Sequence, residues 1–357
     1  MSVSYGGDSI TFADSSTIAS GFTGFKNRII NGGMDIAQRG TSFTSTSSAN
    51  NDDTYVLDRF YILSDGNDIV DVTQTTTVPT GAKYSIGLDV ETVNKKFGIA
   101  QIIENANCYD AIGGNVTISF QAKVSATANL DNIKCAIVSW SGTADTVTSD
   151  IISAWGAEGT NPTLIANATY ENTPANLGVT TSFATYSVTA NVDTASTSNI
   201  ILFIWSDVTT TALGEFLYIT NVQLEKGSTA TSFEYRDFGR ELALCQRYYT
   251  KSYQYSTAPG TSTQLGLVGG AVALTSLGGS ISIPFFTQMR ILPNMLFWDK
   301  VGTASTVTGI NSAETATNGL STSPNGPFNI SQNSFWLTGN GQSTYVIFCH
   351  YTASAEL

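Results

Sequence analysis

The residues that could act in catalysis are few in this sequence, and the single histidine, His350, is the most informative of them. A Ser/His/Asp or Cys/His arrangement would have to be built around this one imidazole. His350 stands in an apolar run near the end of the chain, which predicts a structural role in a terminal strand. GxSxG, P-loop and HExxH motifs are missing from the sequence. We therefore expect a protein that is not an enzyme.

A short acidic stretch, SDGNDIVD at residues 64–71, offers hard oxygen ligands at close spacing. Its carboxylates Asp65, Asp68 and Asp71 are candidate ligands of calcium, the one cofactor that the sequence suggests. The spacing is not that of an EF-hand, because no glutamate stands at the twelfth loop position. A turn with solvated carboxylates is the simpler interpretation, so no obligatory cofactor is expected.

Aromatic side chains near polar loops are the best candidates for recognising a ligand. A flat ring can stack on the face of a sugar while neighbouring amides bond its hydroxyl groups. In the last third of the chain this combination selects five candidate ligand-binding residues: Trp298, Asn333, Phe335, Trp336 and Asn340. Packing in a hydrophobic core is the alternative for each of the rings.

The cysteines are predicted to be structural residues. The four of them are widely spaced, form no CxxC motif and each stand beside apolar or aromatic residues: Cys108, Cys135, Cys245 and Cys349. This pattern predicts reduced, mostly buried thiols, with neither a disulfide nor a metal role.

We expect short β-strands to position these residues, because apolar and polar side chains alternate along many segments of the sequence. Residues 115–124 (NVTISFQAKV) place apolar side chains on one face and polar ones on the other, which indicates a half-buried strand. Similar segments follow at residues 132–140, 185–192, 199–205 and 215–224. Many short strands with turn signals between them predict two packed antiparallel sheets, in a sandwich or a jelly roll.

Strand signals resume after residue 265 and predict a second β domain of about 100 residues. A charged segment at residues 237–252 separates the two, and Asp237 is a suitable N-cap for a short helix there. Leu242, Cys245 and Tyr249 fall on one side of that helix. We therefore expect an all-β chain in four parts: an N-terminal attachment or oligomerisation segment (1–30), a first sandwich (31–236), a helical connector (237–252) and a C-terminal β domain (253–357).

Charge and hydropathy exclude some partners. The formal net charge of −12 would repel a phosphate backbone, so nucleic acid is not an expected partner. Apolar runs such as residues 199–205 are far shorter than the ~20 residues of a membrane span, and we expect no membrane insertion. The first residues lack a secretory signal, yet the Thr- and Asn-rich composition suits an exposed surface. A virion component, assembled in the host cytoplasm and released by lysis, reconciles the two.

Three sequence blocks carry a family resemblance. NRIINGGMDIAQRG (27–40), LDRFYI (57–62) and NVQLEKGSTATSFEYRDFGRELALCQRYY (221–249) resemble, in this order, blocks of phage tail-fibre and related virion fibre proteins. SITFADSST (9–17) resembles an N-terminal motif of such proteins that usually reads I-x-F-x-D-G, although Ser15 stands where glycine is usual.

The resemblance implies a non-enzymatic, homotrimeric virion protein. Its first sandwich would be a jelly roll like that of carbohydrate-binding modules, and a variable second β-sandwich would form the tip. Residues 1–30 would join other virion proteins, and the tip would contact a glycan on the host surface. Two alternatives stay open: a capsid-decoration fibre or structural tail component without receptor contact, and a polysaccharide depolymerase, for which the 28 acidic residues supply carboxylate pairs.

Overall fold

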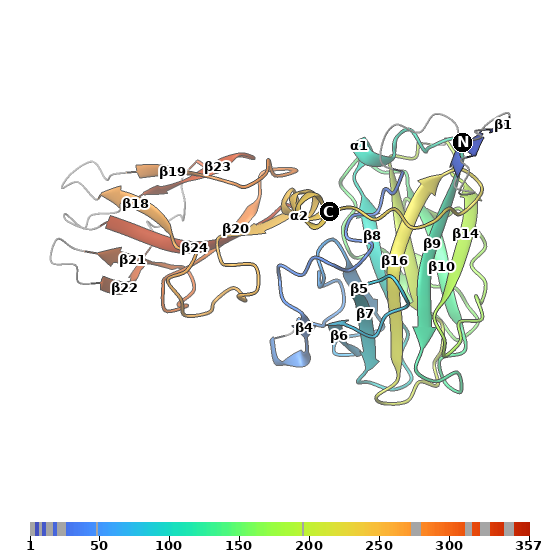
Figure 1. Ribbon diagram of the computed structural model, residues 1–357. Coiled ribbons are helices and arrows are strands. Elements are labelled where there is room, and N and C mark those ends of the chain that lie inside the picture. The colour runs from blue at the N-terminus through green and yellow to red at the C-terminus, as the bar shows by residue number, and fades with distance from the viewer. Residues whose placement is uncertain are drawn as a thin grey trace.

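The computed structural model describes residues 4–6, 9–11, 17–19, 26–47, 49–194, 196–272, 280–310, 316–321, 329–338 and 346–357. These residues form two β domains that meet at the helix α2 (Phe238–Gln246), as Figure 1 shows. The protein is nearly all β, which confirms the fold class predicted from the alternation. Within the described part of the chain, neither helix has the length and apolar character that crossing a membrane would require.

The larger domain is a sandwich of two antiparallel sheets. In spatial order, the six-stranded sheet contains β14 (Ala184–Asn191), β9 (Asn115–Val124), β16 (Phe216–Lys226), β7 (Ser85–Val90), β6 (Val70–Thr75) and β4 (Ser42–Phe43). The five-stranded sheet contains β13 (Ala168–Tyr170), β10 (Ile133–Trp140), β15 (Asn199–Ser206), β8 (Phe97–Ile103) and β5 (Tyr61–Ser64).

Eight of these strands pair in a nested order. Strand β7 pairs with β16, β8 with β15, β9 with β14, and β10 with β13, always antiparallel. The first strand therefore lies beside the last, the second beside the second last, and so on inward, which is the topology of a jelly roll. Alternate residues of β9, from Val116 to Val124, face the core between the sheets as the sequence predicted.

The outer faces of the two sheets differ. On the five-stranded sheet, Phe203 and Trp205 of β15 are covered by a long segment that contains β11 (Ile152–Ala154) and β12 (Thr163–Leu164). Trp155 of that segment meets Phe203 edge to face, with ring centroids 6.0 Å apart. The outer face of the six-stranded sheet instead carries half-exposed polar and aromatic side chains. Among the described residues, the area of this second face around Gln121, Lys123 and Tyr218 is therefore more accessible to a ligand than the covered face.

The C-terminal domain is built around one long strand, β24 (Val346–Ser354). Its second half lies between β17 (Tyr249–Lys251) and β20 (Asn294–Trp298), and its first half between β18 (Val268–Val272) and β21 (Thr306–Ile310). The strand β22 (Ala316–Ser321) extends this sheet beyond β21, and β19 (Ser280–Pro284) pairs with β23 (Ser334–Thr338) in a second sheet. Side chains of both sheets share one core, so this domain is a second β-sandwich.

The connecting segment departs from the sequence prediction after residue 246. Asp237 caps α2 through a hydrogen bond from the backbone N of Arg240 (3.1 Å), and Cys245 is buried, both as predicted. The helix ends at Gln246, however, and Tyr249 begins β17 in the C-terminal sheet. The segment at 237–252 is therefore part helix and part strand, because pairing with β24 satisfies the backbone of residues 249–251.

The remaining elements are short. At the N-terminal end, β1 (Ser4–Gly6), β2 (Ser9–Thr11) and β3 (Thr17–Ala19) form a small antiparallel sheet. Residues 12–16 of the predicted attachment motif lie outside the described residues, and the attachment role stays a prediction. A 3-10 helix, η1 (Ser45–Ser47), and the helix α1 (Asn105–Cys108) complete the described elements.

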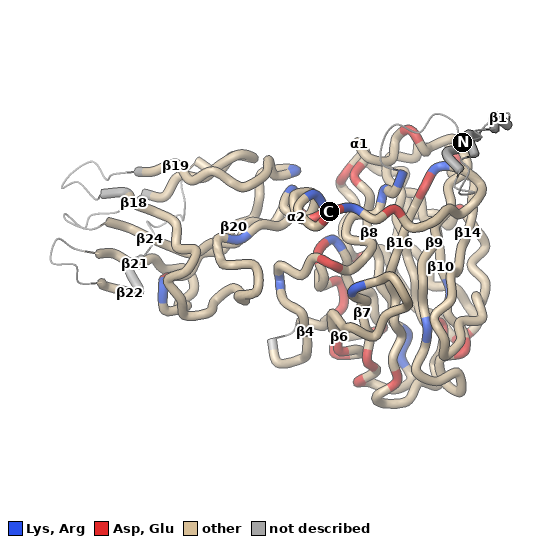
Figure 2. Tube along the Cα trace, in the orientation of Figure 1, with Lys and Arg blue, Asp and Glu red and all other residues tan. Residues whose placement is uncertain are grey.

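The junction between the domains is rich in charge. Figure 2 shows that Lys, Arg, Asp and Glu gather on the jelly roll and around α2, whereas the far end of the C-terminal domain carries few of them. Residues 355–357 follow β24 into this junction. The carboxylate of Glu356 pairs there with Arg59 and with Arg39 (3.1 Å), both of the jelly roll.

Candidate functional site

The ligand-binding residues predicted in the C-terminal domain do not form one site. Phe335 is fully buried and packs against Tyr351 with ring centroids 5.0 Å apart, so the prediction of a sugar-stacking ring is wrong at this position. Trp298 is half-buried against Tyr253, with ring centroids 6.1 Å apart. Trp336 is 43% exposed on β23.

Two predicted amides complete that set. Asn333 is exposed in the turn before β23, where its backbone N bonds the hydroxyl of Ser331 (3.2 Å). Asn340 lies outside the described residues. Trp336 and Asn333 therefore keep their accessibility, and their role in binding stays a prediction.

The three predicted calcium ligands are not all brought together. Asp65 pairs with Lys95 (3.1 Å), while Asp68 and Asp71 both accept from the amide of Asn50, at 2.7 and 2.9 Å. Within the described ranges, no three acidic, histidine or cysteine side chains form a group that could hold a metal ion. The carboxylates of this stretch therefore have protein donors as partners, and calcium binding stays a prediction.

His350 is held as a structural residue. Its ring stacks on Tyr253, with centroids 3.9 Å apart, and its Nε2 lies 3.1 Å from the carbonyl oxygen of Thr263. Because a carbonyl only accepts, Nε2 carries the proton and Nδ1 accepts from the Ser252 hydroxyl (3.2 Å). Burial lowers the pKa of His350, although its bond to Thr263 partly offsets this. The Ser252 hydroxyl thus orients a buried, neutral ring.

The cysteines follow the sequence prediction. All four are free and buried. Burial raises the pKa of Cys108 and of Cys349 to about 12, which keeps both thiols protonated near neutral pH.

The open face of the jelly roll carries an aromatic surface that sequence reasoning missed. We call it the tyrosine face, and it comprises Gln121, Lys123, Phe183, Phe216, Tyr218 and Asn221. Tyr218 and Phe216 project from the same side of β16, and their rings stack at 5.2 Å with an interplanar angle of 5°. Lys123 of β9 lies directly across from Tyr218 in the register. Its ammonium is 5.2 Å from the Tyr218 ring and 5.3 Å from that of Phe183.

A glycine shapes this surface. Gly87 of β7 stands opposite Tyr218 across the strand pair. A Cβ at this position would lie 3.3 Å from Cε1 of Tyr218 and 3.2 Å from the hydroxyl of Thr73. The glycine therefore lets the tyrosine ring lie down over the sheet, between the threonines of β6 and Lys123.

Amide groups lie beside the rings. The Asn221 amide donates to Gln121 Oε1 at 2.6 Å, and both side chains are half-exposed. Asn221 has a φ of 51° where the register of β16 against β9 shifts between Thr220 and Gln223. Such a bulge re-aims a side chain, and here it brings an amide onto the outer face. In the strict alternation of residues 215–224, Phe216 and Tyr218 share a side with Val222 and Leu224, so no local pattern indicated that these two rings face outward. The register shift between Thr220 and Gln223 separates the two pairs.

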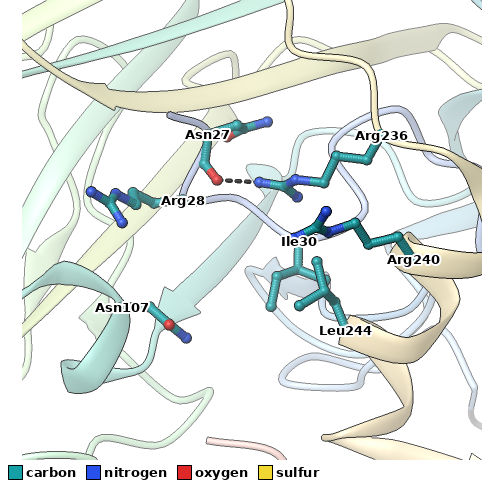
Figure 3. A pocket seen from close by; sticks show the side chains of 7 residues that line it. All are labelled: Asn27, Arg28, Ile30, Asn107, Arg236, Arg240 and Leu244. Carbon is teal, nitrogen blue, oxygen red and sulfur yellow. Dashed lines mark hydrogen bonds between the residues drawn. The ribbon is translucent and has the colours of Figure 1, made fainter. Parts of the chain in front are cut away.

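A second concave feature lies where the jelly roll meets α2. This pocket, of about 260 Å³, is shown in Figure 3. Its described lining includes Arg28, Ile30, Asn107, Arg236, Arg240 and Leu244. In the view of Figure 3, Arg236, Arg240 and Leu244 stand on one side, and Arg28 and Asn107 on the other.

The fold and the site define an all-β protein with an open jelly-roll face. No family model matches the sequence, and no curated protein does. Among solved structures, similar chains include the enzymatically active domain of tailspike protein 4 from bacteriophage CBA120, at 17% identity and a TM-score of 0.33. That match covers 56% of this chain and 21% of the tailspike chain, so the present chain spans about a fifth of that structure's length.

Two further similar structures have carbohydrate-related names. One is a structure from Bacteroides thetaiotaomicron that is described as a sugar binding protein. It matches at 12% identity with a TM-score of 0.35, and the match covers 57% of this chain and 100% of that chain. The CBM22-1 xylan-binding domain of Paenibacillus barcinonensis Xyn10C matches at 14% identity with a TM-score of 0.30, covering 54% and 100%. At such low TM-scores, these similarities do not bear on function.

Proposed function

We propose that this chain is a non-enzymatic, glycan-binding fibre protein of a phage virion. The observation that carries the proposal is the tyrosine face, an aromatic surface with adjacent amides on the more accessible outer face of the jelly roll. The sequence blocks at residues 27–40, 57–62 and 221–249 support the assignment to a virion fibre.

The chemistry of the tyrosine face suits a sugar. The C–H face of a pyranose would pack on Tyr218, where burial of apolar surface supplies the attraction. The amides of Gln121 and Asn221 offer donors and acceptors for hydroxyl groups, and Lys123 adds a donor. The six residues that define the tyrosine face include no carboxylate, although Asp89 stands opposite Phe216 in the neighbouring strand. We expect the face to bind a glycan without cleaving it.

Attachment of a particle to a cell through weak sugar sites requires several copies of the site. One shallow face binds a sugar weakly, because little ligand surface is buried. A homotrimer with several copies per particle would convert weak contacts into firm adsorption through effective concentration.

The same proposal places the chain in a tail fibre whose first 30 residues join other virion proteins. Light scattering on the full chain tests the trimer, and a purely monomeric mass at micromolar concentration would count against it.

The substitution Tyr218→Ala tests the tyrosine face. We expect the wild-type chain to bind a subset of sugars on a glycan array, and we expect Tyr218→Ala to weaken that binding about tenfold or more, because a central aromatic anchor is lost. Affinity electrophoresis in a gel that contains the bound polysaccharide gives the measurement. Tyr109→Ala is the matched control, because Tyr109 is 67% exposed on the turn after α1.

Two outcomes would contradict the proposal. One is binding that Tyr218→Ala leaves unchanged while its thermal unfolding matches wild type. The other is the release of new reducing ends when the protein is incubated with the bound polysaccharide, which would revive the depolymerase alternative.

A further inference from the structure

We propose that the pocket between the jelly roll and α2 binds a carboxylate-bearing ligand of the size of one acidic sugar. Among the described residues that line it, three are arginines and none is acidic. This is a concentration of positive charge in a chain whose formal net charge is −12. Carboxylates are the partners that guanidinium groups bind best, through paired and charge-assisted hydrogen bonds.

The acidic residues nearby hold the arginines in place from outside the lining. Asp110 pairs with Arg28 at 2.8 Å, and Glu241 pairs with Arg236 at 3.1 Å. Arg236 also donates to the carbonyl oxygens of Asn27 and Ile29, and its side chain is only 5% exposed. Figure 3 shows the contact of Arg236 with Asn27. The charge at this wall is therefore fixed before a ligand arrives, which lowers the entropy cost of binding.

One arginine of the pocket lining has an unsatisfied donor. The Nε of Arg28 is buried and has no hydrogen-bond partner among the described residues. A ligand that draws this guanidinium toward it would give the donor an acceptor. The pocket is thus lined by three guanidinium groups, one of which has a donor that lacks an acceptor.

The size and the remaining lining select the ligand class. A volume of about 260 Å³ falls just below the roughly 300–1,000 Å³ of pockets for drug-sized ligands, so a single small ring fits better than a chain. Ile30 and Leu244 give the pocket an apolar part, which suits the C–H face of a sugar. The Asn107 amide can bond a hydroxyl group. A bare phosphate would leave the apolar part unused.

This site lies beyond the proposed function, because it shares no residue with the tyrosine face. A failure at one site leaves the other untouched: Tyr218→Ala tests only the open face of the sheet. Arg240→Gln tests only the pocket, since Arg240 is exposed at the start of α2 and lines it.

Calorimetric titration of the full chain with three probes tests the pocket. We expect glucuronate to bind saturably, and glucose, which has the same ring without the carboxylate, to bind at least about tenfold more weakly. Inorganic phosphate should also bind more weakly than glucuronate. Arg240→Gln should weaken glucuronate binding about tenfold, and Lys83→Gln, an exposed charge change away from the pocket lining, should not alter it.

A second variant keeps the test decisive if Arg240→Gln disturbs folding. Asn107→Asp conserves shape and adds a carboxylate to the lining, so it should abolish glucuronate binding by like-charge repulsion. Absence of saturable glucuronate binding up to about 10 mM would overturn the proposal. So would equal affinity for glucose and glucuronate, or for phosphate and glucuronate, or full glucuronate binding by a folded Asn107→Asp protein.

Discussion

At the scale of single residues, Asp53 makes the free energy of unfolding depend on pH. Its backbone is left-handed, with a φ of 62°, and its buried Oδ1 has no hydrogen-bond partner among the described residues. Burial, followed by the charges of Asp52 and Asp150, raises the pKa of Asp53 to about 7. In the unfolded chain an aspartate has a pKa of about 3.9. Between these two values the folded state keeps a proton that the unfolded state releases, so the stability that Asp53 contributes falls as the pH rises.

The substitution Asp53→Asn should remove this loss of stability at rising pH. Asparagine tolerates the left-handed backbone and carries no charge, so the variant should gain stability over wild type as the pH rises from about 4 to 7. We expect a gain of about 1–2 kcal/mol above pH 7 and little gain near pH 4. Urea unfolding at both pH values measures it, with the exposed change Asp131→Asn as control. A pH-independent difference would contradict the explanation.

At the scale of the elements, a buried ammonium attaches a long segment to the five-stranded sheet. Lys96 precedes β8 and is 1% exposed, and it pairs with Asp207, which follows β15. The same ammonium donates to the carbonyl oxygens of Ala157 (2.7 Å) and Thr160 (3.0 Å). The segment that covers the apolar outer face of the sheet is therefore fixed by a cation at its turn. Lys134 adds a second cation beside Asp207, at 2.7 Å.

The substitution Lys96→Met should destabilise the jelly roll strongly. It leaves Asp207 buried beside a single lysine and removes the donor from three carbonyl groups, those of Trp155, Ala157 and Thr160, a loss of about 3–5 kcal/mol. Lys95→Met is a neighbouring control, because the Lys95–Asp65 pair is largely exposed and should contribute less than about 1 kcal/mol. Denaturant unfolding compares the two. Similar midpoints for both variants would show that Lys96 does not anchor the segment.

At the scale of the whole molecule, the three resemblance blocks meet at the domain junction. From the first block, Asn31 bonds the carbonyl oxygen of Asp58 (3.0 Å) and Gln38 bonds that of Tyr249 (2.8 Å). From the second, the guanidinium of Arg59 lies 3.7 Å from the ring centroid of Tyr248 in the third. Segments that are far apart in sequence therefore build one polar seam that holds the two sandwiches together.

Glu356 is the residue on which this seam can be tested. Its carboxylate pairs with two jelly-roll guanidinium groups, those of Arg59 and Arg39, which are 1% and 13% exposed. We expect Glu356→Gln to cost about 3–5 kcal/mol of junction stability, because both cations lose their counter-charge. Calorimetry should then resolve two unfolding transitions where the wild type shows one.

Glu91→Gln, an exposed change of the same kind, is the control for this experiment. A single unchanged transition in Glu356→Gln would show that the charge of Glu356 does not couple the two domains. The packing of Cys245, Tyr248 and Leu357 against the jelly roll would then account for the coupling.

The sequence alone determined the local structure of this protein. Alternation along β9 predicted which side of the strand faces the core, and the short apolar runs between turn residues predicted an all-β chain. The cap at Asp237 predicted where α2 begins. These features depend on neighbours within a few residues, and therefore the sequence displays them directly.

Only the tertiary structure decided which distant groups meet, and which side of β16 and of β23 meets solvent. Phe335 and Trp336 are adjacent in β23, and the position of the facing sheet buries the first and exposes the second. Tyr218 became part of a surface because the cover lies on the other sheet and because Gly87 faces its ring. The aspartates at 65, 68 and 71 found donors elsewhere in the fold. Contacts of this kind join residues far apart in the chain, and no local pattern encodes them.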